Sequence, residues 1–290
     1  MNKSKPFTYV LWAIGLLLLP LLLQSMGNAW VRIADMALLY VLLALGLNIV
    51  VGYAGLLDLG FVDFFAVGAY MFGLLASPHL TDTFPWIAAM FPNGLHTPLW
   101  AVIPIGAALA GLFGVLLGAP TLKLRGDYLA IVTIATAEIV RLFVRSVRFK
   151  QFFGGSDGIN SFSTQFRDLS PFDPSKQYGF RPFQYSGYTF WTLIVAWCLV
   201  GIFGIVVFYL MRSPWGRVLK AIREDEDAVR SLGKNVYSYK MQALVMGGVI
   251  GMFSGMVFAL DRGSVQPDNY SRDVTFYVLT ALVLGGVAKV

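Results

Sequence analysis

The sequence predicts an all-α fold, a polytopic helical bundle that is integral to a membrane. Hydrophobic residues make up 57% of the 290 residues, charged residues only 13%, and the mean hydropathy is +0.67. A chain with so few charges cannot cover a soluble domain with polar surface. Apolar runs near the length of a membrane span recur along it, about eight in all. No long polar stretch separates them, so we expect a single transmembrane domain over residues 1–290.

The predicted spans follow these apolar runs in order. They occupy residues 7–23, 35–51, 57–76, 98–118, 128–144, 188–210, 239–260 and 274–288. Most approach the roughly 20 residues that a spanning helix needs. The first run could instead be a cleaved signal peptide, because Lys3 and Lys5 precede it and small residues follow it near Gly27 and Ala29. Its length exceeds the roughly 7 to 15 residues of a usual signal core, which favours a retained anchor.

The distribution of lysine and arginine favours a cytoplasmic N-terminus. This orientation leaves the loop at residues 77–97, which contains no Lys or Arg, on the outer side. It places a large group of bases inside: Lys3, Lys5, Lys123, Arg125, Arg212, Arg217, Lys220, Arg223, Arg230, Lys234 and Lys240. Arg32, Arg262, Arg272 and the bases of the predicted external loop at residues 145–187 argue against it. The net charge of +6 fits the cytoplasmic flanks of spans and needs no nucleic-acid partner.

The segment at residues 211–240 is a charged island between two apolar runs. Ser213 is a good N-cap and Pro214 fits the first helical turn. Gly233 with Asn235 marks a stop, so the pattern predicts about five turns of helix. Two i,i+4 ion pairs, Lys220 with Glu224 and Glu226 with Arg230, would stabilise this helix.

The apolar face of this helix leaves two interpretations open. Its residues are Trp215, Val218, Leu219, Ile222, Val229 and Leu232, interrupted by Asp225 and Glu226. A helix this charged cannot span lipid, but its apolar residues need a partner. Either the helix docks to another protein at the cytoplasmic face, or it is a solvated loop helix that rests on its own membrane domain.

Residue types that carry enzyme chemistry are scarce. The two histidines, His79 and His96, lie in the predicted outer loop near prolines, where a solvated histidine is the ordinary case. Cys198 is alone, so neither a disulfide nor a cysteine-based metal cluster can form within the chain. Gly233-Lys234 is followed by Asn235 and lacks the upstream glycine of a phosphate-binding loop. We therefore predict that the chain is no enzyme, holds no metal or cofactor, and depends on another chain for nucleotide hydrolysis.

Two predicted spans carry small residues at every fourth position. One stripe consists of Gly106, Ala110, Gly114 and Gly118, and the other of Gly247, Gly251, Gly255 and Ala259. Such stripes let helix backbones approach closely. The contact lies either inside the chain, which we favour, or with a second subunit.

Four charged residues lie in or beside predicted spans: Asp58, Asp63, Glu138 and Arg141. A charge at the centre of a span costs about 2.5 to 3.5 kcal/mol on insertion scales. Glu138 and Arg141 are three positions apart and can pair on one helix face. Asp58 would begin its helix and favour the helix N-terminus. Asp63 lies over a turn deeper, and we expect a basic or hydroxyl group, of this chain or of a partner subunit, to pair with its carboxylate.

Five blocks of the sequence together resemble one protein family. They are residues 52–70 (GYAGLLDLGFVDFFAVGAY), 124–133 (LRGDYLAIVT), 138–141 (EIVR), 154–159 (GGSDGI) and the charged island with 221–233 (AIREDEDAVRSLG). In this order they are similar to the LivM-type permease subunits of branched-chain amino-acid ABC importers. The resemblance runs from about Asp35 to the end of the sequence.

The resemblance implies that the charged island contacts an ATPase. In that family the segment similar to residues 221–233 is the cytoplasmic loop that makes this contact. Asp227-Ala228-Val229 followed by Gly233 looks like a degenerate Glu-Ala-Ala-x-x-x-Gly motif. The ATPase-coupling residues implied are Trp215, Val218, Ile222, Glu226, Asp227, Ala228, Val229 and Gly233.

The resemblance also implies a function. The chain would be one permease subunit in a bacterial cytoplasmic (inner) membrane, translocating branched-chain or related amino acids by alternating access. A paralogous permease would complete the pathway, two cytoplasmic ATPase subunits would bind the ATP, and an extracytoplasmic amino-acid-binding protein would deliver the substrate. The alternative is an ion-coupled secondary transporter in which Asp63 or Glu138 carries a proton.

The sequence departs from the family pattern at two places. Asp63 stands where the family usually has a small or apolar residue. The sequence stops at residues 284–290, where family members usually run on through a Gly-rich turn and another helix. We expect a C-terminally shortened form on that ground.

Overall fold

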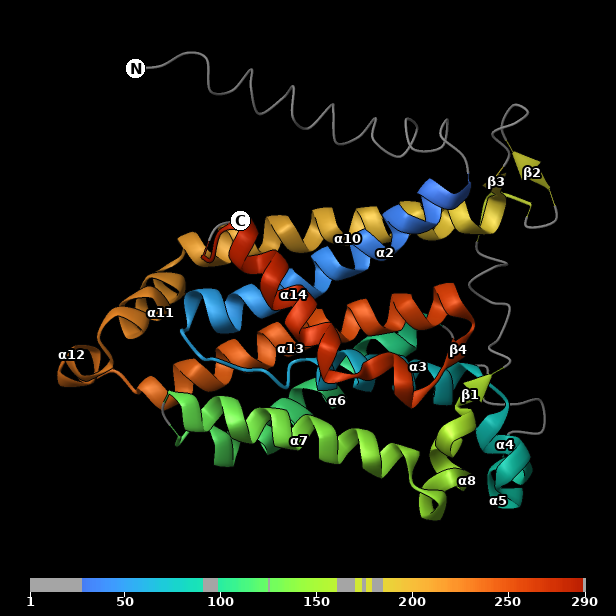
Figure 1. Cartoon of the computed structure of the whole chain (residues 1–290), viewed down its shortest axis with the longest axis horizontal. Coiled ribbons are helices and arrows are strands. Elements are labelled where there is room, and N and C mark those ends of the chain that lie inside the picture. Colours follow the sequence, from blue (N-terminus) through green and yellow to red (C-terminus); the bar gives the residue numbers. More distant parts are fainter. Residues whose placement is uncertain are drawn as a thin grey trace.

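The computed structural model describes residues 28–90, 99–124, 126–160, 170–173, 176–178 and 185–288. Within them the chain is a bundle of helices, with two small antiparallel strand pairs at one end of the molecule (Figure 1). The predicted all-α membrane fold is therefore confirmed. The predicted first span at residues 7–23, as well as His96 and Arg125, lies outside the described residues, so the choice between anchor and signal peptide stays a prediction.

Seven of the predicted apolar runs form helices. These are α2 (Asn28–Leu47) with its π-helical continuation η1 (Asn48–Tyr53), α3 (Val62–Ala76), α6 (Leu99–Thr121), α7 (Asp127–Arg145), α10 (Gly187–Arg212), α13 (Val236–Arg262) and α14 (Arg272–Gly285). Among the described helices, four are long and apolar enough to cross a membrane: α2 with η1, α6, α10 and α13. Because α3 and α14 are shorter and α7 carries more charge, the count of about eight spans is not confirmed.

The short elements gather at the two ends of the bundle (Figure 1). One end holds α4 (His79–Thr83), α5 (Pro85–Met90), η2 (Val147–Phe149), α8 (Lys150–Phe153), η3 (Gly155–Asp157), β1 (Ile159–Asn160), β2 (Gln177–Tyr178), β3 (Tyr185–Ser186), β4 (Ser264–Val265) and η4 (Pro267–Tyr270). The other end holds α11 (Pro214–Glu224) and α12 (Glu226–Ser231). The described residues of the loop predicted to be external and the segment predicted to be cytoplasmic therefore lie at opposite ends.

Antiparallel strand pairs tie the first of these ends together. β1 pairs with β4, with Ile159 opposite Val265, and β2 pairs with β3. The β1–β4 pair joins the segment after α7 to the segment after α13, which are far apart in the sequence. Each pair has only two residues per strand, so apolar packing in the bundle rather than a sheet holds the fold.

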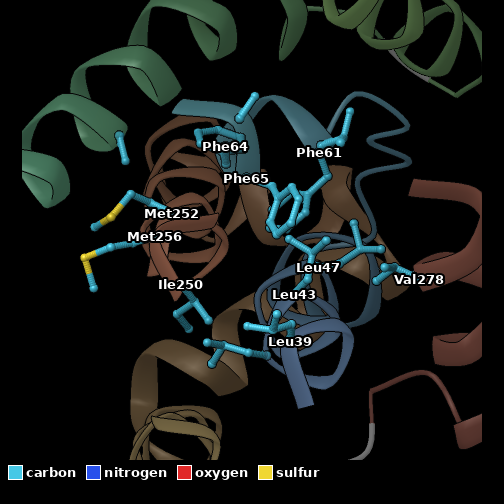
Figure 2. Packing of buried hydrophobic residues seen from close by; sticks show 14 of the residues in the cluster. Leu39, Leu43, Leu47, Phe61, Phe64, Phe65, Ile250, Met252, Met256 and Val278 are labelled. Atoms are coloured by element: carbon cyan, nitrogen blue, oxygen red, sulfur yellow. The ribbon is translucent and has the colours of Figure 1, made fainter. Parts of the chain in front are cut away.

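Helix α13 lies at the centre of the bundle and packs on α2, α3 and α6. In its most apolar window 78% of the residues are buried, against 17% for α10, which has a largely exposed surface. Figure 2 shows Phe61, Phe64 and Phe65 beside Met252 of α13 and Leu47 of α2. These side chains are all buried. The rings of Phe61 and Phe64 also pack on each other, with their centroids 5.5 Å apart. The aromatic start of α3 is thereby wedged between two long helices.

The small-residue stripes explain how closely these helices approach. A Cβ added at Gly247 would lie 2.7 Å from the carbonyl oxygen of Gly46 in α2, and one added at Gly255 would collide with the carbonyl of Phe65 in α3. A Cβ at Gly251 would be crowded by Phe61 and Phe64, and those at Gly106, Gly114 and Gly118 would meet side chains of α3 and α13. The structure thus places both stripes in packing within the chain, which is the interpretation favoured from the sequence.

Candidate functional site

The charged island folds into two helices. The Ser213 hydroxyl accepts a hydrogen bond from the Gly216 amide, and Pro214 opens α11, as the sequence predicts. At Asp225 the backbone becomes extended, with φ −151° and ψ 102°. Its carboxylate accepts hydrogen bonds of 3.0 Å from the amides of Asp227 and Ala228, and so caps α12. The prediction of one helix of about five turns is wrong, because this side-chain cap replaces helix continuation at Asp225.

The end of the island also differs in part from the prediction. Gly233 has φ +76°, and its amide donates to the Arg230 carbonyl, so it ends α12 as expected. Asn235 was predicted to belong to that stop. Instead its side chain accepts a hydrogen bond of 3.1 Å from the Ser238 amide and caps the start of α13.

Ion pairs connect α12 to α13. Glu226 contacts Arg230 at 2.8 Å, which is the predicted i,i+4 pair, and Lys240 at 2.6 Å. The other predicted pair is absent from the ion pairs of the described residues: the Lys220 ammonium lies 5.3 Å from the centre of the Tyr53 ring rather than on Glu224. Lys220 of α11 therefore contacts the bundle rather than another residue of its own helix.

The apolar face of α11 packs on the chain's own bundle. Leu219 and Ile222 of α11 are buried, as is Val229 of α12, and Val218 is half-buried. Trp215 is also half-buried, and its indole N–H donates to the Gln242 side chain of α13 at 2.8 Å. Of the two interpretations left open by the sequence, the structure places these side chains against the chain's own membrane domain.

The exposed apolar surface of this helix pair lies on α12 and the turn after it. Asp227 and Ala228 are exposed, and Leu232, the C-cap of α12, is 79% exposed. Leu232 is thus a single large apolar side chain among charged residues at the outer end of the helix pair. Leu232 was predicted to share the buried face, but the break at Asp225 turns α12 and thereby turns Leu232 outward.

Arg223 ties α11 to the segment between α2 and α3. Its guanidinium Nη1 donates to the Gly52 carbonyl at 2.6 Å. Gly55 has φ +68°, and a Cβ there would lie 3.0 Å from the Arg223 side chain. Gly52 belongs to the π-helical stretch η1, a rare conformation that is often found at functional sites. The sequence counted Arg223 only among the cytoplasmic bases, because nothing local reveals a partner 171 positions away.

Asp58 lies in the loop before α3 and does not begin the helix. Its carboxylate accepts a hydrogen bond of 2.9 Å from the Gly60 amide. The neighbouring Leu59 amide donates to the Thr133 hydroxyl of α7 at 3.1 Å. The predicted position of Asp58 at a helix start is wrong, because the side chain of Asp58 bonds to the backbone two residues on and favours a turn.

Asp63 lies in the first turn of α3 and is 3% exposed. The depth predicted for it is wrong, and the pairing of its carboxylate with a group of a partner permease stays a prediction. It is at the helix start because α3 begins at Val62, and within the described residues its Oδ2 has no hydrogen-bond partner. The buried hydroxyls of Tyr70 and Tyr270 are likewise without a hydrogen-bond partner there. Sequence reasoning missed both tyrosines, since an aromatic residue in an apolar stretch gives no sign of an unpaired hydroxyl.

Glu138 and Arg141 pair on α7 as expected, with Arg141 Nη2 2.7 Å from Glu138 Oε1. Arg141 also lies 3.4 Å from Asp268 of η4. Away from these charges, His79 Nε2 lies 3.1 Å from the Gln151 carbonyl oxygen, and Cys198 is exposed on α10. No group of three or more His, Cys, Asp or Glu among the described residues could hold a metal ion.

Comparison with known proteins identifies the family. Residues 30–290 match the family described as the branched-chain amino acid transport system / permease component. The chain belongs to this permease family. It is 35% identical over 96% of its length to the high-affinity branched-chain amino acid transport system permease protein LivM of Escherichia coli (strain K12). It is 36% identical over 89% of its length to the LivM protein of Salmonella typhimurium and 28% identical over 86% to a probable LivM of Methanocaldococcus jannaschii.

The permease chain is similar to only part of its relatives. The matches span 64% of the Escherichia coli protein, 59% of the Salmonella protein and 72% of the Methanocaldococcus protein. No solved structure matches it. Membership in a permease family indicates a transport component of the membrane rather than an enzyme.

Proposed function

We propose that this chain is a membrane-spanning permease subunit of an ABC importer that translocates branched-chain or related amino acids across the cytoplasmic membrane. Its family supports this function. The observation that carries the proposal is the helix pair α11–α12 at one end of the bundle, packed on the bundle through Ile222 and exposed through Leu232. Such a pair can receive a cytoplasmic partner on one side and pass movement to the membrane helices on the other.

The proposed assembly has four other subunits. A paralogous permease completes the pathway in the lipid bilayer, two ATPase subunits bind ATP beneath it, and an extracytoplasmic binding protein delivers the amino acid. The N-terminus lies in the cytoplasm, because α11 and α12 then face the ATPases. ATP is bound by the partner subunits, and this chain supplies no cofactor site.

Movement would pass from the ATPases to the substrate pathway through α11. A displacement of α11 pulls on η1 through Arg223 and Gly52, and η1 leads through the loop containing Asp58 to the start of α3. Helix α7 has room to move, since an apolar groove of about 560 Å³ lies between it and helices α3 and α6. These parts give the bundle a rigid centre and a movable side, as alternating access requires.

Reconstituted transport tests this function. The chain, its paralogous permease, the ATPases and the binding protein would be placed in vesicles, and uptake of leucine, isoleucine and valine measured with and without ATP. We expect uptake that requires ATP. Uptake that is independent of ATP and driven by a proton gradient would contradict the proposal and support the ion-coupled alternative.

A substitution on α12 tests the ATPase contact. Leu232→Asp places a charge on a residue that is 79% exposed, so it leaves the bundle intact but puts an unpaired charge into a contact with the ATPase. We expect less ATPase to co-purify with the permease. Val147→Asp is the control, because Val147 is 86% exposed at the opposite end of the bundle. Equal ATPase retention by the two variants would place the contact elsewhere.

A further inference from the structure

A pocket lies near the end of the bundle that is opposite α11 and α12 (Figure 1). Its volume of about 350 Å³ falls within the roughly 300 to 1,000 Å³ of small-ligand sites. Helices α2, α3, α13 and α14 contribute to its wall, together with the β4–η4 segment that joins α13 to α14. In the orientation proposed above, this is the extracytoplasmic end, where a binding protein would deliver the amino acid.

The segment after α13 brings polar side chains to this pocket. Gly263 has φ +65° and ends α13, so the chain can leave the helix axis and form β4. Val265 of β4 is fully buried opposite β1, and the Asn269 amide donates to the Gln266 carbonyl in η4. Backbone pairing and burial therefore hold this wall in place, while the side chains of Ser264, Gln266 and Asn269 line the pocket.

These three side chains have groups to offer a ligand. Within the described residues, the side chains of Ser264, Gln266 and Asn269 make no hydrogen bond. Gln266 is exposed and the other two are half-buried, so a ligand in the pocket can reach them. Each amide carries both donors and an acceptor, and can therefore bond to a carboxylate or to an ammonium group.

Arg262, the last residue of α13, supplies a cation to the same pocket. Its guanidinium lies 3.6 Å from the Met36 sulfur and 5.7 Å from the centre of the Phe258 ring. Asp261 interacts electrostatically with Arg262 and Arg32 but does not line the pocket. Within the described residues Arg262 forms no ion pair. Its planar donor group matches the geometry of a carboxylate, so an anionic group in the pocket is favoured.

The deeper wall of the pocket is apolar. The rings of Phe65 and Phe258 are buried, with their centroids 5.3 Å apart, and Val274 of α14 is buried beside the same space. Arg262 and Gln266, by contrast, are exposed. The pocket is thus apolar inside and polar toward its opening. This arrangement fits a ligand that combines a carboxylate with a hydrocarbon side chain.

We propose that this pocket binds the transported amino acid at the extracytoplasmic end of the permease. Arg262 receives the carboxylate of the amino acid. The side-chain amides of Gln266 and Asn269 bond to its carboxylate and its ammonium group, and its aliphatic side chain packs on Phe65 and Phe258. The proposal rests on the proposed function and adds a substrate site to it.

Thiol labelling tests whether an amino acid occupies the pocket. Ser264→Cys, in a Cys198→Ser background, should react with a water-soluble methanethiosulfonate in the transporter assembled without its binding protein. We expect leucine to slow this reaction several-fold, and 3-methylbutylamine, which is leucine without its carboxylate, to leave it unchanged. Ser271→Cys is the matched control, because Ser271 is a half-buried serine of the same end that caps nothing and does not line the pocket.

Substitution of Arg262 tests the recognition of the carboxylate. Arg262→Gln should abolish the slowing by leucine, and Arg262→Lys should keep part of it. In vesicles that contain the complete transporter, Arg262→Gln should reduce ATP-driven leucine uptake about tenfold or more, the effect of losing a charged hydrogen bond. Arg272→Gln is the control, because Arg272 is an exposed arginine of the same end that does not line the pocket.

Labelling is measured both without nucleotide and with a non-hydrolysable ATP analogue, so that two states of the transporter are sampled. The site is overturned if Ser264→Cys does not react, or if leucine slows the reaction in neither state. Equal slowing by 3-methylbutylamine, or by leucine in Arg262→Gln, would also overturn it. Slowing by the binding protein but not by leucine would make the pocket a protein contact and not a substrate site.

The outcomes separate this inference from the proposed function, since labelling requires no transport. If the unsubstituted transporter takes up no amino acid with ATP, the proposed function fails, whatever the labelling shows. If it takes up leucine with ATP but leucine does not protect Ser264→Cys, the pocket alone fails.

Discussion

Arg223 offers the sharpest test of how α11 is coupled to the membrane helices. Its guanidinium donates to the Gly52 carbonyl at 2.6 Å. A hydrogen bond from a charged donor contributes about 1.5 to 3 kcal/mol. The Arg223 side chain is exposed, so water competes for it, and we expect about 1 kcal/mol to be lost in Arg223→Gln, a factor of about five in an equilibrium.

The assay compares transport with ATP hydrolysis in the reconstituted complex. If Arg223 passes the movement of α11 to η1, Arg223→Gln should keep the ATPases bound and hydrolysing, while the leucine taken up per ATP falls about fivefold. Arg217→Gln is the control, because Arg217 is another exposed arginine of α11. The leucine taken up per ATP by Arg223→Lys should lie between the values for Arg223→Gln and Arg217→Gln, since lysine retains the charge but not the planar donor group.

Two results would refute this reasoning. Equal uptake per ATP in Arg223→Gln and Arg217→Gln would show that the bond to Gly52 carries no movement. Loss of bound ATPase in Arg223→Gln would instead make Arg223 part of the ATPase contact, and the assignment of that contact to Leu232 would then be wrong.

Three further predictions follow from packing and charge. Gly255→Leu should lower the free energy of unfolding by about 3 kcal/mol, because the new side chain meets the α3 backbone. Gly201→Leu is the control: with open space around residue 201, it should change that free energy by no more than about 0.5 kcal/mol. Thermal unfolding in detergent compares the two variants. Ile222→Asp should cost about 3 kcal/mol or more even without ATPase, seen as loss of monodisperse protein on gel filtration, because Ile222 packs inside the chain. The Lys150 ammonium lowers the pKa of the exposed Asp157 carboxyl. The stabilisation by that pair is therefore full above about pH 4 and lost as the pH falls through the lowered pKa; amide exchange near η3 should show this loss, and Asp157→Asn should abolish it.

The helix ends of the candidate site could largely be predicted from the sequence, but the contacts that its residues make with the rest of the chain could not. Ser213, Pro214 and Gly233 marked helix ends correctly, because capping depends on residues a few positions apart. Asp225 was expected inside a helix, although its side chain caps the next one. An Asp side chain can bond to the nearby backbone in place of helix continuation, and the residue types alone do not decide which arrangement forms. In the structure the break leaves Val229 of α12 buried.

The sequence by itself determined the class of the protein, the places of its apolar helices and its family. Hydropathy and capping are properties of short stretches, so they can be read along the chain. Only the tertiary structure decided which face of α11 is covered, that Arg223 bonds to Gly52, and that the buried Asp63 lines one small pocket together with Tyr70 and Tyr270. Each of these facts depends on residues brought together from distant parts of the chain, and a contact of that kind leaves no local pattern in the residues that make it.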